Sequence, residues 1–191
     1  MFTSECVDDK TYKLVQTTLR EGYIDYDGIT RKPNPQVADM LALEANLGLR
    51  IGDIAKLTTD DFILDGGVWK ICMVEQKTQK SRLFIVPRNM KQFIDEIAAK
   101  NYSPDDNRLF KIGTGMVWKS LRILTRTLGI EYCGTHGFRK RAAQRLFDAT
   151  DGDAAAVCTF LQHASIKTTT TYLRRSSRHM ENAISKMVDL A

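Results

Sequence analysis

Most of the chain alternates between segments with apolar residues at helical spacing and short connections rich in glycine, proline and aspartate. Apolar side chains that recur every three or four residues indicate amphipathic helices, because these positions share one helix face. The pattern predicts helices over residues 8–20, 35–47, 51–57, 89–100, 114–128, 135–149 and 153–161. Pro35 at the start of the second helix and Gly48 just after its end are typical helix boundaries.

Two short runs are instead rich in β-branched and aromatic residues, VWKICMV (68–74) and RLFIVP (82–87). The polar segment QKTQKS joins them, so the two runs predict a β-hairpin with lysines at its tip. No run approaches the ~18 apolar residues that a membrane span requires. The sequence therefore predicts an α+β fold that is mostly α-helical, with a small antiparallel sheet and no membrane contact.

Composition adds that the protein is an ordinary globular one, with 43% hydrophobic and 27% charged residues in 191. Such a chain suffices for one domain with a sizeable core. Its N-terminus, MFTSECVDDK, is acidic and lacks the apolar region of a signal peptide, and its four cysteines form no C-x-x-C pair. We therefore expect a cytoplasmic protein with free thiols and no structural metal.

Charge is distributed unevenly within the net value of +5. Residues 1–110 contain 15 Lys and Arg against 17 Asp and Glu, whereas residues 111–191 contain 13 against 6. A basic half favours a surface that binds a polyanion. The solvated face of an unrelated protein gives the same count, so charge alone does not decide the function.

The basic half also contains the segment with the most informative chemistry, residues 135–175. Arg139 follows His136 by three residues, and Tyr172 follows His163 by nine. A phenol with a pKa of about 10 needs a base and nearby cations to act as a nucleophile. Guanidinium groups match phosphoryl oxygens in bidentate geometry. The combination suits chemistry on a phosphodiester, although an i, i+3 pair is also typical of a plain polar helix face.

A further arginine, Arg50, lies between two predicted helices and among apolar neighbours. An arginine at such a junction needs a partner. Asp53 stands three residues later, so its carboxylate can hold the Arg50 guanidinium. The alternative is a surface ion pair that contributes little.

In order and spacing, these residues resemble the catalytic domain of the tyrosine recombinases, the phage integrase family. His-Gly-Phe-Arg, Leu-Gln-His and the tyrosine nine residues later are similar to the family's His-x-x-Arg, Leu-Gly-His and tyrosine. Leu-Gly-Leu-Arg is similar to its first arginine box, and Lys77-Thr78-Gln79-Lys80 to its hairpin lysine motif. One departure is Gln162 where the family has glycine. If that position takes a positive φ, a side chain there is disfavoured.

The resemblance covers residues 33–175 and implies the recombinase catalytic-domain fold for them. Residues 1–32 are then an N-terminal helix with an irregular connection, and residues 176–191 an amphipathic C-terminal tail helix. The helical domain that usually precedes the catalytic domain has no counterpart, so the chain is either a fragment or one of the short recombinases.

The same resemblance implies a DNA recombinase that works through a 3′-phosphotyrosyl intermediate without ATP, metal or other cofactor. Arg50 and Arg139 would bind the scissile phosphate, and Lys77 would protonate the leaving hydroxyl. His136 would accept a proton, His163 would donate a hydrogen bond, and Tyr172 would attack. The expected phosphate contacts are Lys80, Arg82, Lys140, Arg141, Arg145 and Arg174.

The expected partners are double-stranded DNA and other copies of the chain, with the tail docking in trans to form a tetramer on DNA. A nucleoid-associated protein of bacterial, phage or mobile-element origin fits this reading. Two alternatives stay open: a nicking-closing enzyme similar to type IB topoisomerases, and a DNA-binding module of the same fold without activity. A mixing assay distinguishes them by strand exchange, by relaxation alone, or by binding without a covalent adduct.

Overall fold

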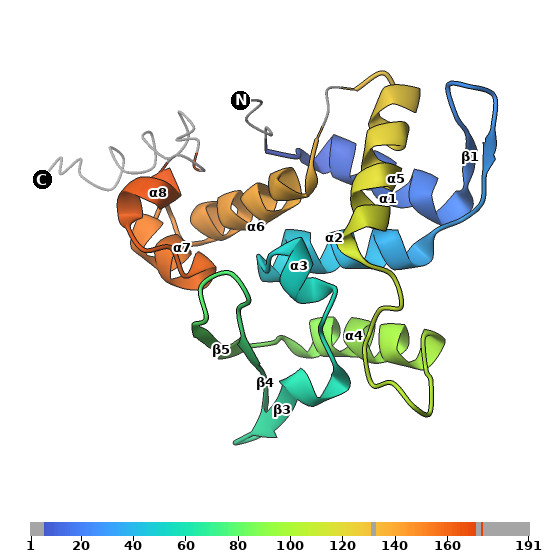
Figure 1. The fold of residues 1–191 in the computed structure, drawn as a ribbon. Helices are drawn as coiled ribbons and strands as arrows, with labels where there is room; N and C mark the ends of the chain where they lie inside the picture. The colour runs from blue at the N-terminus through green and yellow to red at the C-terminus, as the bar shows by residue number, and fades with distance from the viewer. Residues whose placement is uncertain (1–5, 131–132, 171–172, 174–191) are drawn as a thin grey trace, which may run out of the picture.

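The computed structural model describes residues 6–130, 133–170 and 173 (Figure 1). Three of the expected features, Tyr172, Arg174 and the tail over residues 176–191, lie outside this part of the chain. The helices are α1 (Asp9–Glu21), α2 (Pro35–Leu47), α3 (Ile51–Ile54), the 3₁₀ helix η1 (Thr59–Asp61), α4 (Arg88–Lys100), α5 (Thr114–Thr127), α6 (Thr135–Ala149), α7 (Ala154–Leu161) and α8 (Ile166–Thr170). The strands are β1 (Tyr23–Ile24), β2 (Thr30–Arg31), β3 (Phe62–Asp65), β4 (Val68–Val74) and β5 (Ser81–Ile85).

The fold is α+β and mostly helical, as the sequence predicts. Six of the seven predicted helices agree with the structure to within a residue at each end. The exception is the helix expected over 51–57, in which α3 ends at Ile54. The chain continues from there in tighter turns, with the N–H of Leu57 donating to the carbonyl of Ile54 at 3.1 Å. No helix within the described ranges is long and apolar enough to span a membrane.

The sheet contains a strand that the sequence reading did not identify. Strand β3 pairs with β4, and β4 with β5, in an antiparallel sheet of order β3-β4-β5. Gly66 and Gly67 form the β3–β4 turn with φ of 58° and 77°. Two consecutive positive φ values are typical of the tight turns that match strand twist, and glycine adopts them without strain. The Gly-Gly pair was therefore the available signal for β3.

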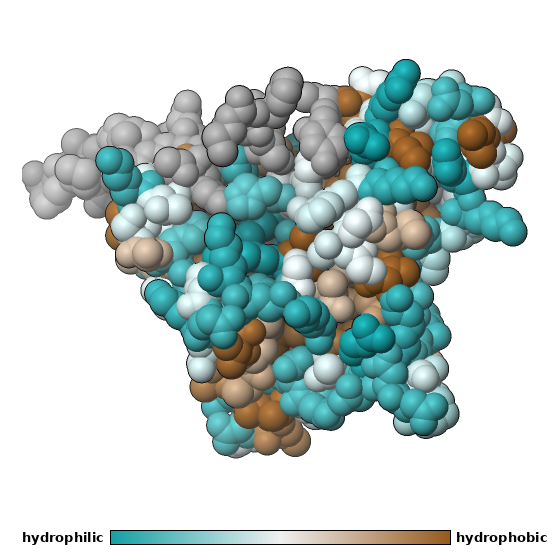
Figure 2. All heavy atoms as spheres, in the orientation of Figure 1, coloured by the Kyte–Doolittle hydropathy of each residue, from teal (hydrophilic) through white to brown (hydrophobic). Residues whose placement is uncertain are grey.

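The two faces of this sheet differ in exposure. Phe62 and Ile71 point inward and are buried, whereas Leu83 and Ile85, on the opposite face, are 60 and 61% exposed. Figure 2 shows apolar side chains gathered on this part of the surface. One packed and one open face is common in antiparallel sheets. The sheet thus contributes only its inner face to the core.

Helix α2 is the centre of the molecule, with nearly every side chain from Val37 to Leu47 buried. It packs against α1, α3, α5 and α6, which surround it (Figure 1). A helix that is buried on nearly all sides is stable only inside such a shell. A smaller cluster joins α6 to α7 through Phe147, Val157 and Leu161. These contacts bring the ends of α2 and α7 together beside the start of α6.

Candidate active site

Arg50 lies immediately after the turn that ends α2, and its partner is Glu75 rather than the expected Asp53. The Nη1 of Arg50 donates to Oε2 of Glu75 at 2.5 Å. Asp53 instead accepts the backbone N–H of Gln76 at 2.9 Å. Asp53 therefore supports the turn between β4 and β5, and the prediction that it holds the Arg50 guanidinium is wrong.

Glu75 is completely buried and binds a second arginine as well as Arg50. Its Oε1 accepts from Nη1 of Arg82 at 2.7 Å, and its Oε2 also accepts from Oγ1 of Thr78 at 2.9 Å. Burial raises the pKa of Glu75, but the hydrogen bonds from Arg50, Arg82 and Thr78 outweigh it and leave the pKa lowered. Glu75 is thus an ionised carboxylate between two guanidinium groups. The sequence motifs predict no role for Glu75.

The position of Arg82 corrects another expectation, because its side chain is only 1% exposed. Besides Glu75, its guanidinium donates to the carbonyls of Leu47 at 3.2 Å and Phe160 at 2.6 Å. A buried guanidinium is tolerated only when it is paired and hydrogen-bonded. Arg82 therefore joins β5 to the ends of α2 and α7 and does not lie on the surface as a phosphate contact.

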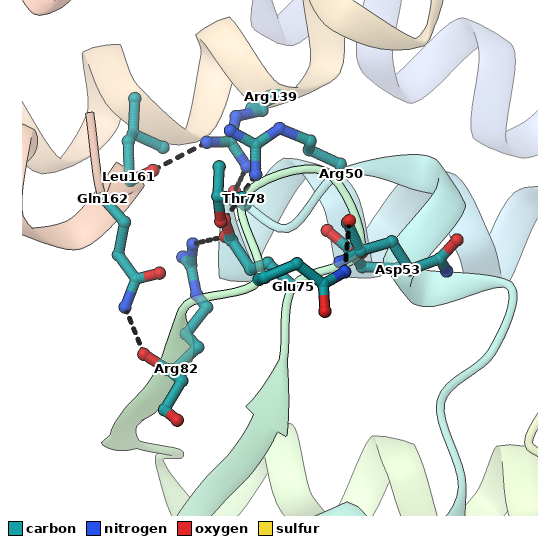
Figure 3. A network of polar contacts seen from close by, with 12 residues as sticks. Arg50, Asp53, Glu75, Thr78, Arg82, Arg139, Leu161 and Gln162 are labelled. Carbon is teal, nitrogen blue, oxygen red and sulfur yellow. Dashed lines mark hydrogen bonds and ion pairs between the residues drawn. The ribbon is translucent and has the colours of Figure 1, made fainter. Parts of the chain in front are cut away.

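Arg139, in the second turn of α6, is equally buried and held by backbone carbonyls. Its Nη1 donates to Gly48 at 2.5 Å and its Nη2 to Leu161 at 2.8 Å. Figure 3 shows the guanidinium groups of Arg139 and Arg50 directed to the same region, next to Glu75 and Thr78 of the hairpin. The two arginines that the sequence singled out thus lie together in the fold.

Gly48 makes this arrangement possible. Its φ is 58°, which places it in the left-handed conformation that ends α2. A Cβ at this position would lie 2.6 Å from Cε1 of Phe160. A side chain is therefore excluded both by backbone conformation and by the close approach of α7. The glycine lets the carbonyl that binds Arg139 face the site.

Both histidines of the predicted motif lie in the field of these arginines. Loss of hydration, followed by the charges of Arg139, Lys140, Arg50 and Lys77, lowers the pKa of His136 to about 4. The His136 side chain is exposed at the start of α6. The His136 ring is then neutral near pH 7 and able to accept a proton.

His163 is half-buried, and its pKa is also lowered to about 4. Burial is the largest cause, followed by the charges of Arg139, Arg50 and His136. Its Nδ1 lies 2.9 Å from Oγ1 of Thr169 in α8, so Nε2 is the ring nitrogen directed elsewhere. Thr169 is buried and fixes the ring orientation. The sequence reading did not identify this threonine, which stands in an unremarkable run of threonines.

Lys77 lies at the tip of the β4–β5 hairpin, and its side chain is exposed. Its charge acts on the pKa of His136, so the tip faces the start of α6. The turn itself is firmly held. Glu75 N–H donates to the carbonyl of Lys80 at 3.0 Å, and the Gln76 side chain donates to the carbonyl of Gly52 at 2.8 Å. A flexible lysine is thus presented on an anchored backbone.

Gln162 takes a positive φ of 51°, which is the conformation expected for the glycine of the family motif. A residue with a side chain is disfavoured there by about 1–2 kcal/mol. The Gln162 side chain donates from Nε2 to the carbonyl of Ser81 at 2.9 Å. The departure at this position therefore adds a contact between the end of α7 and the hairpin.

The remaining predicted phosphate contacts separate into two groups. Lys80 and Arg145 are exposed and Lys140 is half-buried. Arg141 is only 5% exposed, binds Asp9 of α1 at 2.5 Å and stacks on Tyr12. Arg141 therefore fastens α1 to α6, which corrects its expected role at a phosphate.

Known proteins share this fold. The model of the phage integrase family matches residues 31–179. The fold is similar to that of the XerH site-specific recombinase bound to difH substrate, with 17% identity and a TM-score of 0.66 over 94% of this chain and 53% of that one. It is similar to XerA recombinase, with 16% identity and a TM-score of 0.68 over 98% and 65% of the two chains.

A lambda integrase dimer bound to a COC′ core site is also similar, with 15% identity and a TM-score of 0.65 over 93% of this chain and 50% of that one. The chain thus spans about half the length of XerH and of lambda integrase. At these identities the likeness concerns the fold. No curated protein matches the chain.

Proposed function

Since the chain belongs to the phage integrase family, we propose that it is a site-specific DNA recombinase that cleaves and rejoins strands through a 3′-phosphotyrosyl intermediate. One observation carries the proposal. Arg50, Arg139, His136 and His163 come from separate parts of the chain, yet burial and then the charges of the same two arginines lower the pKa values of both histidines. This is a positive site with two neutral proton acceptors, which suits a phosphodiester.

In the proposed reaction, Arg50 and Arg139 bind the non-bridging oxygens of the scissile phosphate and stabilise the charge that develops on them. Arg139 is only 1% exposed, so DNA binding has to open the space in front of its guanidinium. Glu75 neutralises part of the local charge, and it holds Arg50 through a single nitrogen. The other nitrogens of Arg50 then remain for the phosphate.

Proton transfer completes the step. The Tyr172 hydroxyl gives its proton to neutral His136 and forms a new oxygen–phosphorus bond. The bond from phosphorus to O5′ breaks, and Lys77 donates a proton to the departing oxygen. His163 hydrogen-bonds the phosphate through the ring nitrogen that Thr169 does not contact. The product is still a phosphodiester, so a 5′-hydroxyl from another strand reverses the reaction without ATP.

The proposed partners are double-stranded DNA and further copies of this chain. XerH and lambda integrase are each bound to DNA in the structures named above. Lys80, Lys140 and Arg145 are the exposed or half-exposed basic residues that we assign to phosphate contacts, with Arg174. We further propose that the tail over residues 176–191 docks on a neighbouring protomer to form a tetramer on DNA.

The test uses duplexes selected from a random library for binding to the protein, each nicked near the bound site so that cleavage is trapped. Wild-type protein should form a covalent adduct that survives denaturing electrophoresis, and Tyr172→Phe should bind equally but form none. An adduct with Tyr172→Phe would show that another group is the nucleophile. Tight binding without any wild-type adduct would favour the inert DNA-binding module, and relaxation without strand exchange the topoisomerase-like enzyme.

A further inference from the structure

Strand β5 and the end of α7 are joined by contacts that converge on two residues, Phe160 and Gln162. Arg82 donates to the carbonyl of Phe160 at 2.6 Å. The rings of Phe84 and Phe160 meet edge to face with centroids 5.9 Å apart. The Gln162 amide donates to the carbonyl of Ser81 at 2.9 Å. These contacts form one interface between the hairpin and α7.

The interface lies between two parts of the proposed catalytic machinery. On the hairpin side, Ser81 directly follows Lys80, whose carbonyl closes the turn that carries Lys77. On the other side, Gln162 directly precedes His163. A displacement of Ser81 therefore also moves Lys80 and, with it, the turn that carries Lys77. Figure 3 shows Gln162 reaching from the end of α7 to the start of β5.

Arg82 is buried and Phe160 is half-buried, so their contact is part of the packed interior of this interface. Gln162 is a different case. Its φ of 51° is unfavourable for any residue with a Cβ. Glycine would adopt the same backbone freely, so backbone geometry gives no reason for glutamine at this position. What glutamine adds is the bond to the Ser81 carbonyl.

We propose that Gln162 is a positioning residue, which fixes the position of the β4–β5 turn relative to the end of α7. The position of this turn in turn determines how closely Lys77 approaches the leaving O5′. This inference rests on the proposed recombinase function. The Lys77 side chain is exposed and long, so the turn backbone decides where its ammonium group can reach. A general acid must come within hydrogen-bond reach of the oxygen that it protonates, and small misplacements are costly.

The test compares Gln162→Gly with wild type on two nicked substrates, one with a normal phosphodiester and one with sulfur in place of the bridging O5′. A thiolate departs with little need for protonation, so its departure does not depend on Lys77. We expect Gln162→Gly to cleave the normal substrate about tenfold more slowly. On the sulfur substrate we expect a change of less than about twofold.

Two further variants separate this role from a general effect on folding. Gln162→Asn tolerates positive φ but is one methylene too short, so it should reproduce the loss seen with Gln162→Gly. Asp151→Gly relieves a second non-glycine residue with positive φ, at 52° in the α6–α7 turn, and should cleave both substrates at the wild-type rate. Thermal unfolding of Gln162→Gly should occur at or above the wild-type temperature.

A double variant tests whether Gln162 acts through Lys77. In a Lys77→Ala background, Gln162→Gly should cause little additional loss on the normal substrate, because residues in one pathway are not additive. Equal losses on both substrates, full additivity, or no loss at all would each overturn the proposal. No wild-type adduct on either substrate would remove the proposed function itself, and this inference with it.

Discussion

The basic residues of the site fall into two groups that differ in burial. Arg82, Arg139 and Arg141 are 1 to 5% exposed and bind carboxylates or backbone carbonyls. Lys77, Lys80 and Arg145 point into solvent. Composition counts all six alike, but a buried, paired charge contributes little to the field outside the protein. The buried group holds elements of the fold together, with Arg139 also the proposed phosphate ligand, and the exposed group is available for the proposed contacts with DNA.

The largest effect is expected from Arg139, one of the two most buried guanidinium groups. Arg139→Ala should reduce cleavage by about 100-fold or more, as loss of one group that stabilises the transition state does elsewhere. It should also lower the free energy of unfolding by about 2–4 kcal/mol, because the carbonyls of Gly48 and Leu161 lose their donor. Single-turnover cleavage and urea unfolding measure the two effects. Lys140→Ala, one residue later, is the control for stability, and equal stability of both variants would contradict the structural role.

Glu75→Gln tests the pairing of the buried group. Loss of the only carboxylate that Arg82 contacts within the described residues should lower the free energy of unfolding by about 3 kcal/mol. Adding Arg82→Met should recover part of this loss, because the uncompensated charge is then removed. The control is Asp65→Asn, which breaks an exposed ion pair with Lys70 and should change stability by less than about 1 kcal/mol. Similar effects of Glu75→Gln and Asp65→Asn would refute the distinction between buried and exposed pairs.

The histidines provide a smaller, pH-dependent effect. Their pKa values are lowered from 6.5 to about 4 in the folded protein. The unfolded chain therefore binds protons below pH 6.5 that the folded chain does not bind until about pH 4. Stability should decline as the pH falls through this window.

Urea unfolding at pH 7 and pH 5 measures this decline, and His136→Gln and His163→Gln should each make it shallower. The Glu75 pKa is also lowered, so the contribution of Glu75 is present above its ordinary value of 4.5 and is lost only in more acidic solution. A decline that is unchanged in both histidine variants would place its origin in other groups.

The smallest effect concerns DNA affinity. Arg145→Ala should reduce the slope of log K against log salt by about 0.9, as expected for one lost phosphate contact. Arg141→Met should leave the slope unchanged and lower stability, because Arg141 binds Asp9 of α1. Titration of a labelled duplex at several salt concentrations distinguishes the two. A reduced slope for Arg141→Met would return Arg141 to the DNA-binding surface.

The sequence alone was sufficient for the fold class and for six helices to within a residue at each end. It also singled out Arg50, Lys77, His136, Arg139 and His163 as candidates. Helical periodicity and boundary residues act locally, and the spacing of the motif residues is a property of the chain itself. Strand β3 was missed although Gly66 and Gly67 marked its turn, because the strand is short and follows a polar segment.

Only the tertiary structure decided which partner each charge has. In β5, Arg82 and Phe84 alternate with Leu83 and Ile85, and the sequence suggests that the arginine faces outward. The structure places Arg82 inside because Glu75 and the carbonyls of Leu47 and Phe160 surround it there. Tertiary contacts also explain why Arg50 pairs with Glu75 and not with Asp53, the partner expected from the sequence. Ion pairing depends on distance in space, and residues 25 positions apart become neighbours only when the hairpin folds back onto the end of α2.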